Sequence, residues 1–468
     1  MNKDNKKINE EEREYLNRVM RRKRKSNYFS AKLFFATLAV VFVIGLLIPL
    51  RPEKSDEEKR TLTKFPKFTI ESFMNGEYLN GISTWYADTF PFRDTLIGMN
   101  AGIKSLYGTG DTKIVKNSVQ TADEIPVNGE NTAEQEKMEQ EVKAEAQKKL
   151  EEKLPDGTIY DVPQKAGNVY VVGDRGFNLY YYSATSAEMY AALLDKIQRT
   201  IPNCTVYDLL VPTASGVILD QKVAQGLGAS NEQDALRHIA GLIKEKNPNV
   251  KVVESLDNLL KHNAEYIYFR TDHHWTQTGA YYAYEEFAKM KGIEPVKLSD
   301  MDKVDYDGFI GSFYFSGGKP QSMKQNPDLI QAYKSKDTNE INYLDKNQQP
   351  VKWQVISDVT TWMAGAKYST FIGGDNMVSV IDNPNISDGN NVLLIKESYG
   401  NSFAPFLIHH YDKVFIVDYR YFYKYSKYNN NIIQYIADNG IKDVIVLNNA
   451  EAAGSENNIK QMNAMFSH

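Results

Sequence analysis

Four residues whose side chains could take part in catalysis or binding stand next to one another near the middle of the chain. They are Asp272, His273, His274 and Trp275, in a chain that has only seven histidines in all. In an extended segment the side chains at positions i and i+2 point to the same side, so we expect Asp272 and His274 to share one face and His273 to lie on the other. A carboxylate beside an imidazole is the orienting half of a catalytic triad. The motif therefore predicts a triad whose nucleophile lies elsewhere.

A candidate nucleophile stands at the exit of an apolar strand. In "NVLLIKESYGNSFAPF", residues 391–406, the apolar run ends at Glu397 and Ser398 follows it. In α/β folds this is where a nucleophile is presented, close to helix N-terminal amides that can hold an oxyanion. Gly400 and Asn401 stand where a tight turn would form. A strand followed by a turn and a serine is common, so the spacing by itself is a weak signal.

A metal centre is the first alternative. Asp272, His273 and His274, together with His409 and His410 in "LIHHYDKV", would supply nitrogen and oxygen ligands. Neighbouring histidines on a strand diverge, however, and zinc sites favour helical i, i+4 pairs or turn-spaced ligands. We therefore expect no metal and no other cofactor, and we interpret His409 and His410 as structural or surface residues.

A non-catalytic scaffold that binds a glycan or a membrane partner is the second alternative. The chain has 30 tyrosines, and the run "YFYKYSKYNN", residues 421–430, would offer stacking surfaces for sugar rings. Ordinary, partly buried aromatic residues account for the same tyrosines more simply. A scaffold has no need of Asp272, His274 and Ser398 together, so we favour a catalytic site.

The elements that would position these residues alternate along the chain from Gly167 onward. Apolar runs predict strands at 168–173, 204–212, 250–255, 265–270, 391–398, 413–418 and 442–449. Helical spacing predicts helices at 186–201, 232–247, 278–292 and 430–440, with Thr276 or Thr278 as the cap of the third. Residues 305–380 are predicted to be irregular or β-rich. Strands that alternate with helices of this length indicate an α/β domain with a mostly parallel sheet.

The N-terminal segment has the pattern of an uncleaved membrane anchor. Residues 1–25 carry ten Lys or Arg against five Asp or Glu, and residues 33–50 carry no charge. Spanning a bilayer takes roughly 20 apolar residues, whereas a signal peptide has an apolar core of about 7–15 residues and a small-residue cleavage site. We expect a cytoplasmic basic tail at 1–28, a transmembrane helix at 29–50 and, by the positive-inside rule, a main domain outside the cytoplasm.

The remaining residues divide by composition. Residues 51–116 show helical spacing and are expected to form an N-terminal helical block of the extracytoplasmic part. Residues 117–157, rich in Glu, Lys, Gln and Ala, predict a charged insertion or mobile arm, and residues 158–468 hold the α/β domain. The formal charge of −5 argues against a nucleic-acid partner. Cys204 is the only cysteine, so no intramolecular disulfide forms, and its apolar neighbours predict an inert core residue.

The stretch "TDHHWTQTGA", residues 271–280, resembles the signature of the DHHW family of bacterial envelope proteins. These look related to the SGNH-hydrolase-like proteins that take part in alginate O-acetylation. Residues 58–94 are similar to the family's N-terminal block, and three later stretches match in the same order: "FIGGDN" at 371–376, "IKESYGNSFAPFL" at 395–407 and "VDYRYF" at 417–422. The resemblance implies an SGNH-hydrolase-like, three-layer α/β domain and leaves the insertion at 117–157 uncovered.

The resemblance also implies roles for individual residues. Ser398 would be the nucleophile, with His274 as its base and Asp272 as the orienting carboxylate. The family usually has Asp before this serine and "GGN" in the earlier block, whereas this chain has Glu397 and "GGDN". For the oxyanion the resemblance implies Gly374 or Asn376. We expect Tyr399 to be an oxyanion or substrate-binding residue, and His273 to be a structural residue that fixes the turn. We expect Trp275 to form one wall of the sugar site or to pack beneath it.

The implied activity is transfer or removal of an acyl group, most simply acetyl, on a cell-envelope polysaccharide. The implied partners are that polysaccharide, a multipass membrane O-acyltransferase that carries acetyl across the membrane, and membrane lipid around the N-terminal helix. Transferase and esterase share the acyl-serine intermediate and differ in the acceptor alone, so the sequence leaves both open.

Overall fold

The computed structural model describes residues 51, 54–55, 60–74, 77–90, 122–126 and 156–467. The chain divides into two compact units, Met1–Asp111 and Thr112–His468. The basic tail at 1–28 and the membrane helix predicted at 29–50 lie outside the described residues, as does most of the insertion at 117–157. In the described ranges, no helix has the length and apolar character needed to cross a membrane.

The first unit contains two short helices in its described residues, and the second of them coincides with the helical spacing that begins at Tyr78. Its described elements are β1 (Lys54–Ser55), β2 (Arg60–Thr61), α2 (Ile70–Met74) and α3 (Glu77–Asp88). The end of α3 is tied to the preceding segment, because the backbone N–H and the hydroxyl of Thr63 both donate to Asp88 Oδ2 at 2.7 Å.

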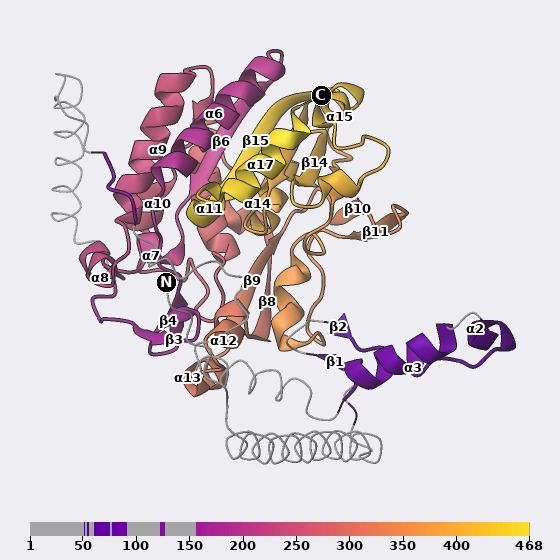
Figure 1. The fold of residues 1–468 in the computed structure, drawn as a ribbon. Helices are drawn as coiled ribbons and strands as arrows, with labels where there is room; N and C mark the ends of the chain where they lie inside the picture. Colours follow the sequence, from indigo (N-terminus) through magenta and orange to yellow (C-terminus); the bar gives the residue numbers. More distant parts are fainter. Residues whose placement is uncertain are drawn as a thin grey trace, which may run out of the picture. The chain divides into compact units, whose positions relative to one another are not determined.

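The second unit is built on one large sheet (Figure 1). Within the described chain this sheet has eight strands, in the spatial order β11 (Pro350–Gln354), β10 (Glu340–Leu344), β12 (Val378–Asp382), β14 (Lys413–Asp418), β13 (Asn391–Lys396), β15 (Ile441–Asn449), β6 (Thr205–Val211) and β7 (Lys251–Val252). From β14 to β7 every pair is parallel, while β12, β10 and β11 add antiparallel pairs at one edge. The predicted α/β class with a mostly parallel sheet is confirmed.

Helices cover both faces of this sheet. Neighbouring residues on β6 show the two sides: the Tyr207 ring lies 5.1 Å from the ring of Phe287, whereas Asp208 accepts a 2.7 Å hydrogen bond from Tyr190. Successive side chains on a strand point to opposite faces, so the helices that carry Phe287 and Tyr190 lie on opposite sides. Tyr190 belongs to α6 (Ala184–Thr200), which packs with α9 (Glu232–Lys246) and α17 (Glu456–Met465); Phe287 belongs to α11 (Gln277–Lys291), which packs with α14 (Gly400–Leu407).

Shorter elements connect these layers. The helices are α7 (Ala214–Val217), α8 (Gln221–Gly226), α10 (Leu256–Lys261), α12 (Ser312–Ser316), α13 (Gln321–Gln325), α15 (Ile432–Asp438) and α16 (Ala450–Ala453), with 3-10 turns η1 (Leu298–Asp300), η2 (Ala364–Thr370), η3 (Ile408–His410) and η4 (Phe422–Lys424). Outside the central sheet, β8 (Asp302–Phe309) pairs with β9 (Asp328–Lys334). The region 305–380 is thus β-rich, as its composition predicts.

Two strand predictions need correction. The run 168–173 does form β4 (Val169–Val172), but this strand belongs to a small antiparallel sheet with β3 (Gln164–Ala166) and β5 (Arg175–Phe177). The run 265–270 forms no strand: it folds back on the next residues, with Thr276 N–H donating to Ile267 O and Phe269 N–H donating to His274 O. The apolar side chains of this run are buried for packing rather than for strand pairing, which periodicity cannot distinguish.

Candidate active site

Ser398 lies between a buried strand and a helix. β13 ends at Lys396, and α14 begins at Gly400. The turn is tight: a side chain on Gly400 would bring its Cβ to 2.5 Å from Lys396 Cβ. Ser398 is 9% exposed. This is the placement at the carboxyl end of a parallel strand that the sequence predicts, with the amides of the first turn of α14 nearby.

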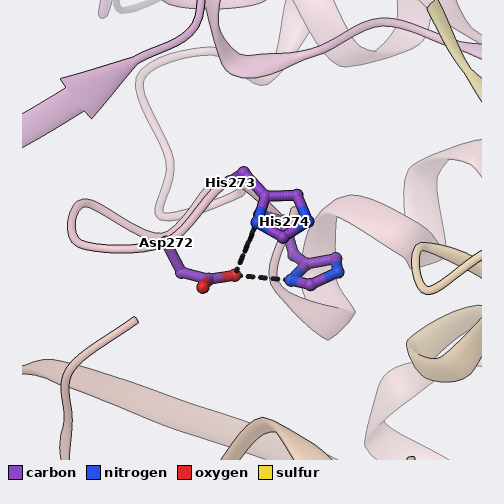
Figure 2. A group of neighbouring side chains, drawn as sticks. All are labelled: Asp272, His273 and His274. Carbon is purple, nitrogen blue, oxygen red and sulfur yellow. Dashed lines mark hydrogen bonds and ion pairs between the residues drawn. The ribbon is translucent and has the colours of Figure 1, made fainter. Parts of the chain in front are cut away.

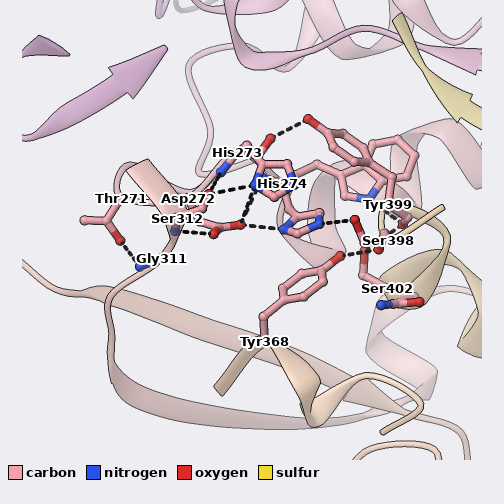
Figure 3. A network of polar contacts seen from close by, with 12 residues as sticks. Thr271, Asp272, His273, His274, Gly311, Ser312, Tyr368, Ser398, Tyr399 and Ser402 are labelled. Atoms are coloured by element: carbon pink, nitrogen blue, oxygen red, sulfur yellow. Dashed lines mark hydrogen bonds and ion pairs between the residues drawn. The ribbon is translucent and has the colours of Figure 1, made fainter. Parts of the chain in front are cut away.

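Asp272, His274 and Ser398 form one chain of hydrogen bonds (Figure 3). His274 Nδ1 lies 2.5 Å from Asp272 Oδ1, and His274 Nε2 lies 2.7 Å from Ser398 Oγ. Both distances are within the reach that a nucleophile, a base and an orienting carboxylate require. His274 and Ser398 are 124 residues apart in the sequence, and the fold brings them together at the strand ends.

A loop after β8 holds the Asp272 carboxylate. Ser312 N–H donates to Asp272 Oδ2 at 2.7 Å, and Gly311 N–H donates to Thr271 Oγ1 at 2.9 Å. Gly311 has room for no side chain, because an added Cβ would lie 2.2–2.5 Å from Asp272 Cβ, Oδ2 and Cγ. Asp272 is 2% exposed, and its carboxylate accepts from Ser312 N–H and also from His274 N–H at 3.1 Å. The loop therefore fixes the carboxylate from the side opposite to His274.

Tyr368 holds the imidazole of His274. The two rings stack with centroids 3.9 Å apart and an interplanar angle of 8°. The Tyr368 hydroxyl donates to Ser398 O at 2.9 Å, so one side chain contacts both His274 and Ser398. Burial raises the pKa of Tyr368 well above its ordinary value, so the hydroxyl stays protonated and remains a donor.

His273 does not lie on the face opposite to His274, so the parity argument is wrong. The two imidazoles have centroids 3.8 Å apart, and both lie near the Asp272 carboxylate (Figure 2). The reason is local: residues 271–274 bend rather than extend. His273 Nδ1 makes a 2.7 Å hydrogen bond with Ser312 Oγ, and its carbonyl accepts from the Tyr399 hydroxyl. These contacts support the structural role predicted for His273.

Trp275 and Tyr399 pack beneath the triad. Trp275 is 0% exposed and Tyr399 is 1% exposed, and Trp275 Nε1–H donates to Tyr399 O at 3.0 Å. A buried indole has no surface to offer a substrate, so Trp275 supports the site from below instead of forming a wall of it. The Tyr399 ring packs against both of its neighbours, with its centroid 5.4 Å from the Trp275 ring and 5.3 Å from the His274 ring.

The "GGDN" segment is joined to the nucleophile turn through its aspartate. Asp375 Oδ1 accepts from Lys396 Nζ at 3.1 Å and from Asn401 Nδ2 at 2.9 Å, and Arg420 lies 2.9 Å from Asp375 Oδ2. Lys396 is buried and also pairs with Asp418. Burial by itself raises the pKa of Asp375, but the Lys396 and Arg420 cations outweigh it and hold the pKa well below the ordinary value.

The two oxyanion candidates sit in this segment. Gly374 has φ 89° and donates its N–H to Phe371 O at 3.0 Å. Asn376 Nδ2 donates to Ile372 O at 3.3 Å, which leaves one of its two amide hydrogens for another acceptor. The Gly374 amide is thus engaged in its own turn, so of the two residues only Asn376 keeps a hydrogen that it can donate.

Glu397 contacts the nucleophile directly. Its Oε2 lies 3.2 Å from Ser398 Oγ and 3.1 Å from Tyr399 N, and its Oε1 accepts from Asn449 N at 3.2 Å. Burial raises the pKa of Glu397. The carboxylate that replaces the family's usual Asp therefore still reaches the serine and links it to the end of β15.

A metal remains sterically compatible with the motif. Asp272, His273 and His274 place ligand atoms within 4.8 Å of one another. A metal ion there would have to replace hydrogen bonds that both nitrogens of His274 already make. His409 and His410 take no part: His409 pairs with Asp337, and His410 bonds the Tyr284 hydroxyl.

Sequence reasoning missed the residues that support the triad. Gly311, Ser312 and Tyr368 lie 36 or more residues after the motif Asp272–Trp275, in a region that shows no periodic pattern. Asp375 carried a signal, since it is the additional residue in "GGDN". Glu397 is the single carboxylate in the "IKES" stretch, but the sequence gives no sign that it contacts the hydroxyl of Ser398.

Comparisons with known proteins agree with this architecture. The sequence profile of the family described as DHHW protein matches residues 58–159 and 154–417. A crystal structure of a DHHW family protein from Eubacterium siraeum is 28% identical, with a TM-score of 0.56, and covers 66% of this chain and 98% of that one. The structure of Bacillus cereus PatB1 with a sulfonyl adduct is 17% identical, with a TM-score of 0.51 over 64% of this chain and 98% of that one, and shows likeness of fold. No curated protein matches the sequence.

Proposed function

The chain belongs to the DHHW protein family, and we propose that it is a serine O-acyltransferase or esterase that moves acetyl groups on a cell-envelope polysaccharide. The observation that carries the proposal is the hydrogen-bonded chain from Asp272 through His274 to Ser398 at the carboxyl end of β13. The contacts of Ser312 and Tyr368 with this chain add support, because they fix the carboxylate and the imidazole in the geometry that proton transfer needs.

In the first half of the reaction Ser398 Oγ attacks the acyl carbonyl carbon of an ester donor, and His274 Nε2 takes the hydroxyl proton. Asp272 stabilises the imidazolium that forms. The bond from the acyl carbon to the donor oxygen then breaks, and His274 returns the proton to the leaving alcohol. The Ser398 amide and Asn376 would donate to the oxyanion of the tetrahedral intermediate.

In the second half a sugar hydroxyl or water attacks the acyl-serine. His274 takes the proton of the acceptor, the ester bond to Ser398 Oγ breaks, and the proton passes to Ser398. Transfer and hydrolysis differ only in which hydroxyl reaches the acyl carbon. The acetyl donor would come from a multipass membrane O-acyltransferase, and the polybasic tail with the helix at 29–50 would anchor the chain with its main domain outside the cytoplasm.

The test uses the purified full chain, in detergent for the proposed anchor, with p-nitrophenyl acetate as donor. Ser398→Ala and His274→Ala should each lower kcat/KM by about 10⁴-fold or more, and the double variant should be no worse, because the groups act as a unit. Intact-mass measurement should detect one acetyl group on the wild type and none on Ser398→Ala. Ser387→Ala, an exposed serine, is the matched control. Full turnover by Ser398→Ala would refute the serine mechanism.

A metal-dependent reaction is the second candidate, because the ligand atoms of Asp272, His273 and His274 lie close together. It predicts turnover that survives Ser398→Ala and is lost with chelator. The proposed location has a separate test: protease added to intact protoplasts should degrade the α/β domain and spare the N-terminal tail. Protection of the large domain would refute the proposed topology.

A further inference from the structure

A small cavity lies beside the triad and takes no part in the proposed proton transfers. Its lining includes Asn178, Thr213, His273, Phe313, Tyr399 and Glu451. Its volume is ≈ 10 Å³, which is about the room that one water-sized group needs. Two of the lining residues, His273 and Tyr399, pack against His274, with ring centroids 3.8 and 5.3 Å from the His274 ring. The cavity therefore adjoins side chains that contact the triad.

The cavity lies at the carboxyl ends of three adjacent parallel strands. Thr213 follows β6, Tyr399 follows β13 and Glu451 follows β15, and β15 pairs with both of the others. Ser398 stands at the end of the same β13. In open α/β sheets, ligands bind in the crevice outside these strand ends, so the position is that of a substrate subsite.

The polar groups of the cavity suit a hydroxyl. Asn178 Nδ2 donates to Glu451 Oε2 at 3.1 Å, and in the described part of the chain this is the one side-chain hydrogen bond of the Glu451 carboxylate. Both residues are half-buried, so Oε1 is open to a ligand. A carboxylate accepts and an amide donates, which are the two contacts that a hydroxyl group makes.

The charge state of Glu451 fits the same ligand. Burial raises the pKa of Glu451 to about 7, against the hydrogen bond from Asn178, and repulsion from Glu232 and Glu397 adds to the rise. Near neutral pH the carboxyl group therefore both accepts and donates hydrogen bonds. Glu232 is itself held by Thr213, whose N–H and hydroxyl donate to its two oxygens at 2.6 and 2.8 Å, and it is not available to a ligand.

We propose that this cavity is the acceptor subsite, and that Glu451 and Asn178 bind the hydroxyl adjacent to the one that receives the acyl group. The inference rests on the proposed function and narrows the acceptor to a compound with neighbouring hydroxyls. The reacting hydroxyl gives its proton to His274 and forms the new ester bond, while the bond from the acyl carbon to Ser398 Oγ breaks and Ser398 regains a proton. Glu451 and Asn178 transfer no proton and are positioning residues. The His273 ring, with 34% of its side chain exposed, forms the rim against which the acceptor rests.

The experiment measures how the acyl-enzyme divides between two acceptors. The full chain is loaded from p-nitrophenyl acetate in the presence of equal concentrations of methyl β-D-glucopyranoside, which has neighbouring hydroxyls, and ethanol, which has one. Mass spectrometry gives the ratio of acetylated glucoside to ethyl acetate. The wild type should favour the glucoside, and Glu451→Gln and Asn178→Ala should each lower the ratio by about tenfold, the scale for one hydrogen bond to a charged group.

Controls keep the result unambiguous. Glu245→Gln, an exposed glutamate on α9, should leave the ratio at the wild-type value, and melting temperatures should show that Glu451→Gln and Asn178→Ala are folded. The proposal is overturned if the wild type shows no preference for the glucoside, or if the variants lower both products equally. A wild type that releases no acetate, or release that persists in Ser398→Ala, refutes the proposed function and this inference with it.

Discussion

Gly311→Ala tests whether the position of the Asp272 carboxylate matters for catalysis. The new methyl group would lie 2.2 Å from Asp272 Cβ, where ordinary contact begins at 3.4 Å, so one of the two must move by about 1.2 Å, the difference between these values. Such a shift would break the 2.7 Å hydrogen bond from Ser312 N–H and disturb the one to His274. A misplacement of about 1 Å costs on the order of 10²-fold in rate, and loss of the orienting carboxylate costs about 10⁴-fold.

We therefore expect kcat/KM for p-nitrophenyl acetate to fall by between about 10²- and 10⁴-fold in Gly311→Ala. Gly241→Ala is the matched control, because an added Cβ there meets nothing within 4 Å, and the helix α9 should gain stability from it. In an Asp272→Asn background, Gly311→Ala should cost much less than it does alone, since residues of one unit are not additive.

The outcome that contradicts this reasoning is a folded Gly311→Ala variant with nearly wild-type kcat/KM. It would mean that Asp272 tolerates displacement and that the loop after β8 supports the fold and not the chemistry. If Gly311→Ala melts far below the wild type, the same variant is measured at low temperature, with His274 ring resonances observed by NMR to locate the imidazole.

Three further predictions follow from named contacts. Tyr368→Phe keeps the stacked ring and loses the hydroxyl donor to the Ser398 carbonyl, so kcat should fall by about tenfold, while Tyr368→Ala should lose far more; equal losses would assign the effect to the hydroxyl alone. His273→Ala should retain more activity than His274→Ala, and chelator should change neither rate; the reverse order would favour a metal. Burial raises the pKa of Asp208 from 3.8 to about 7, so stability present below about pH 4 is lost as the pH rises toward 7. Asp208→Asn should therefore raise the melting temperature most at pH 8 and little at pH 4, and a difference independent of pH would contradict the raised pKa.

Local pattern was enough to predict the strands that carry the nucleophile side of the site. The apolar runs of β6, β13, β14 and β15 are longer than their neighbours and buried on both faces, which is the pattern typical of central parallel strands. The same reasoning placed Ser398 at a strand exit and offered Thr276 or Thr278 as the cap of α11. In the structure Thr276 is the cap, and its side chain accepts from Gly279 N–H. The family resemblance then paired Ser398 with Asp272 and His274.

Pattern failed where burial and strand pairing give the same signal. The run 265–270 is apolar enough for a strand, yet its backbone bonds go to residues 274 and 276, and the chain bends at the motif. The bend brings His273 beside His274, which an extended geometry excludes. Periodicity indicates which side chains are buried. It does not indicate with which residues the backbone N–H and C=O groups of the same segment form hydrogen bonds.

The sequence by itself thus determined the fold class, the positions of the central parallel strands along the chain and the identity of the three residues in the hydrogen-bonded chain. Only the tertiary structure decided what surrounds them: Gly311 against the carboxylate of Asp272, Tyr368 against the imidazole of His274, and Glu451 at a cavity that His273 and Tyr399 also line. These neighbours come from segments that lie far from the motif in the chain and have no period of their own. Their selection depends on shape and hydrogen bonding at the strand ends, and those constraints exist only once the fold has brought the ends of β8, β13 and β15 to one place.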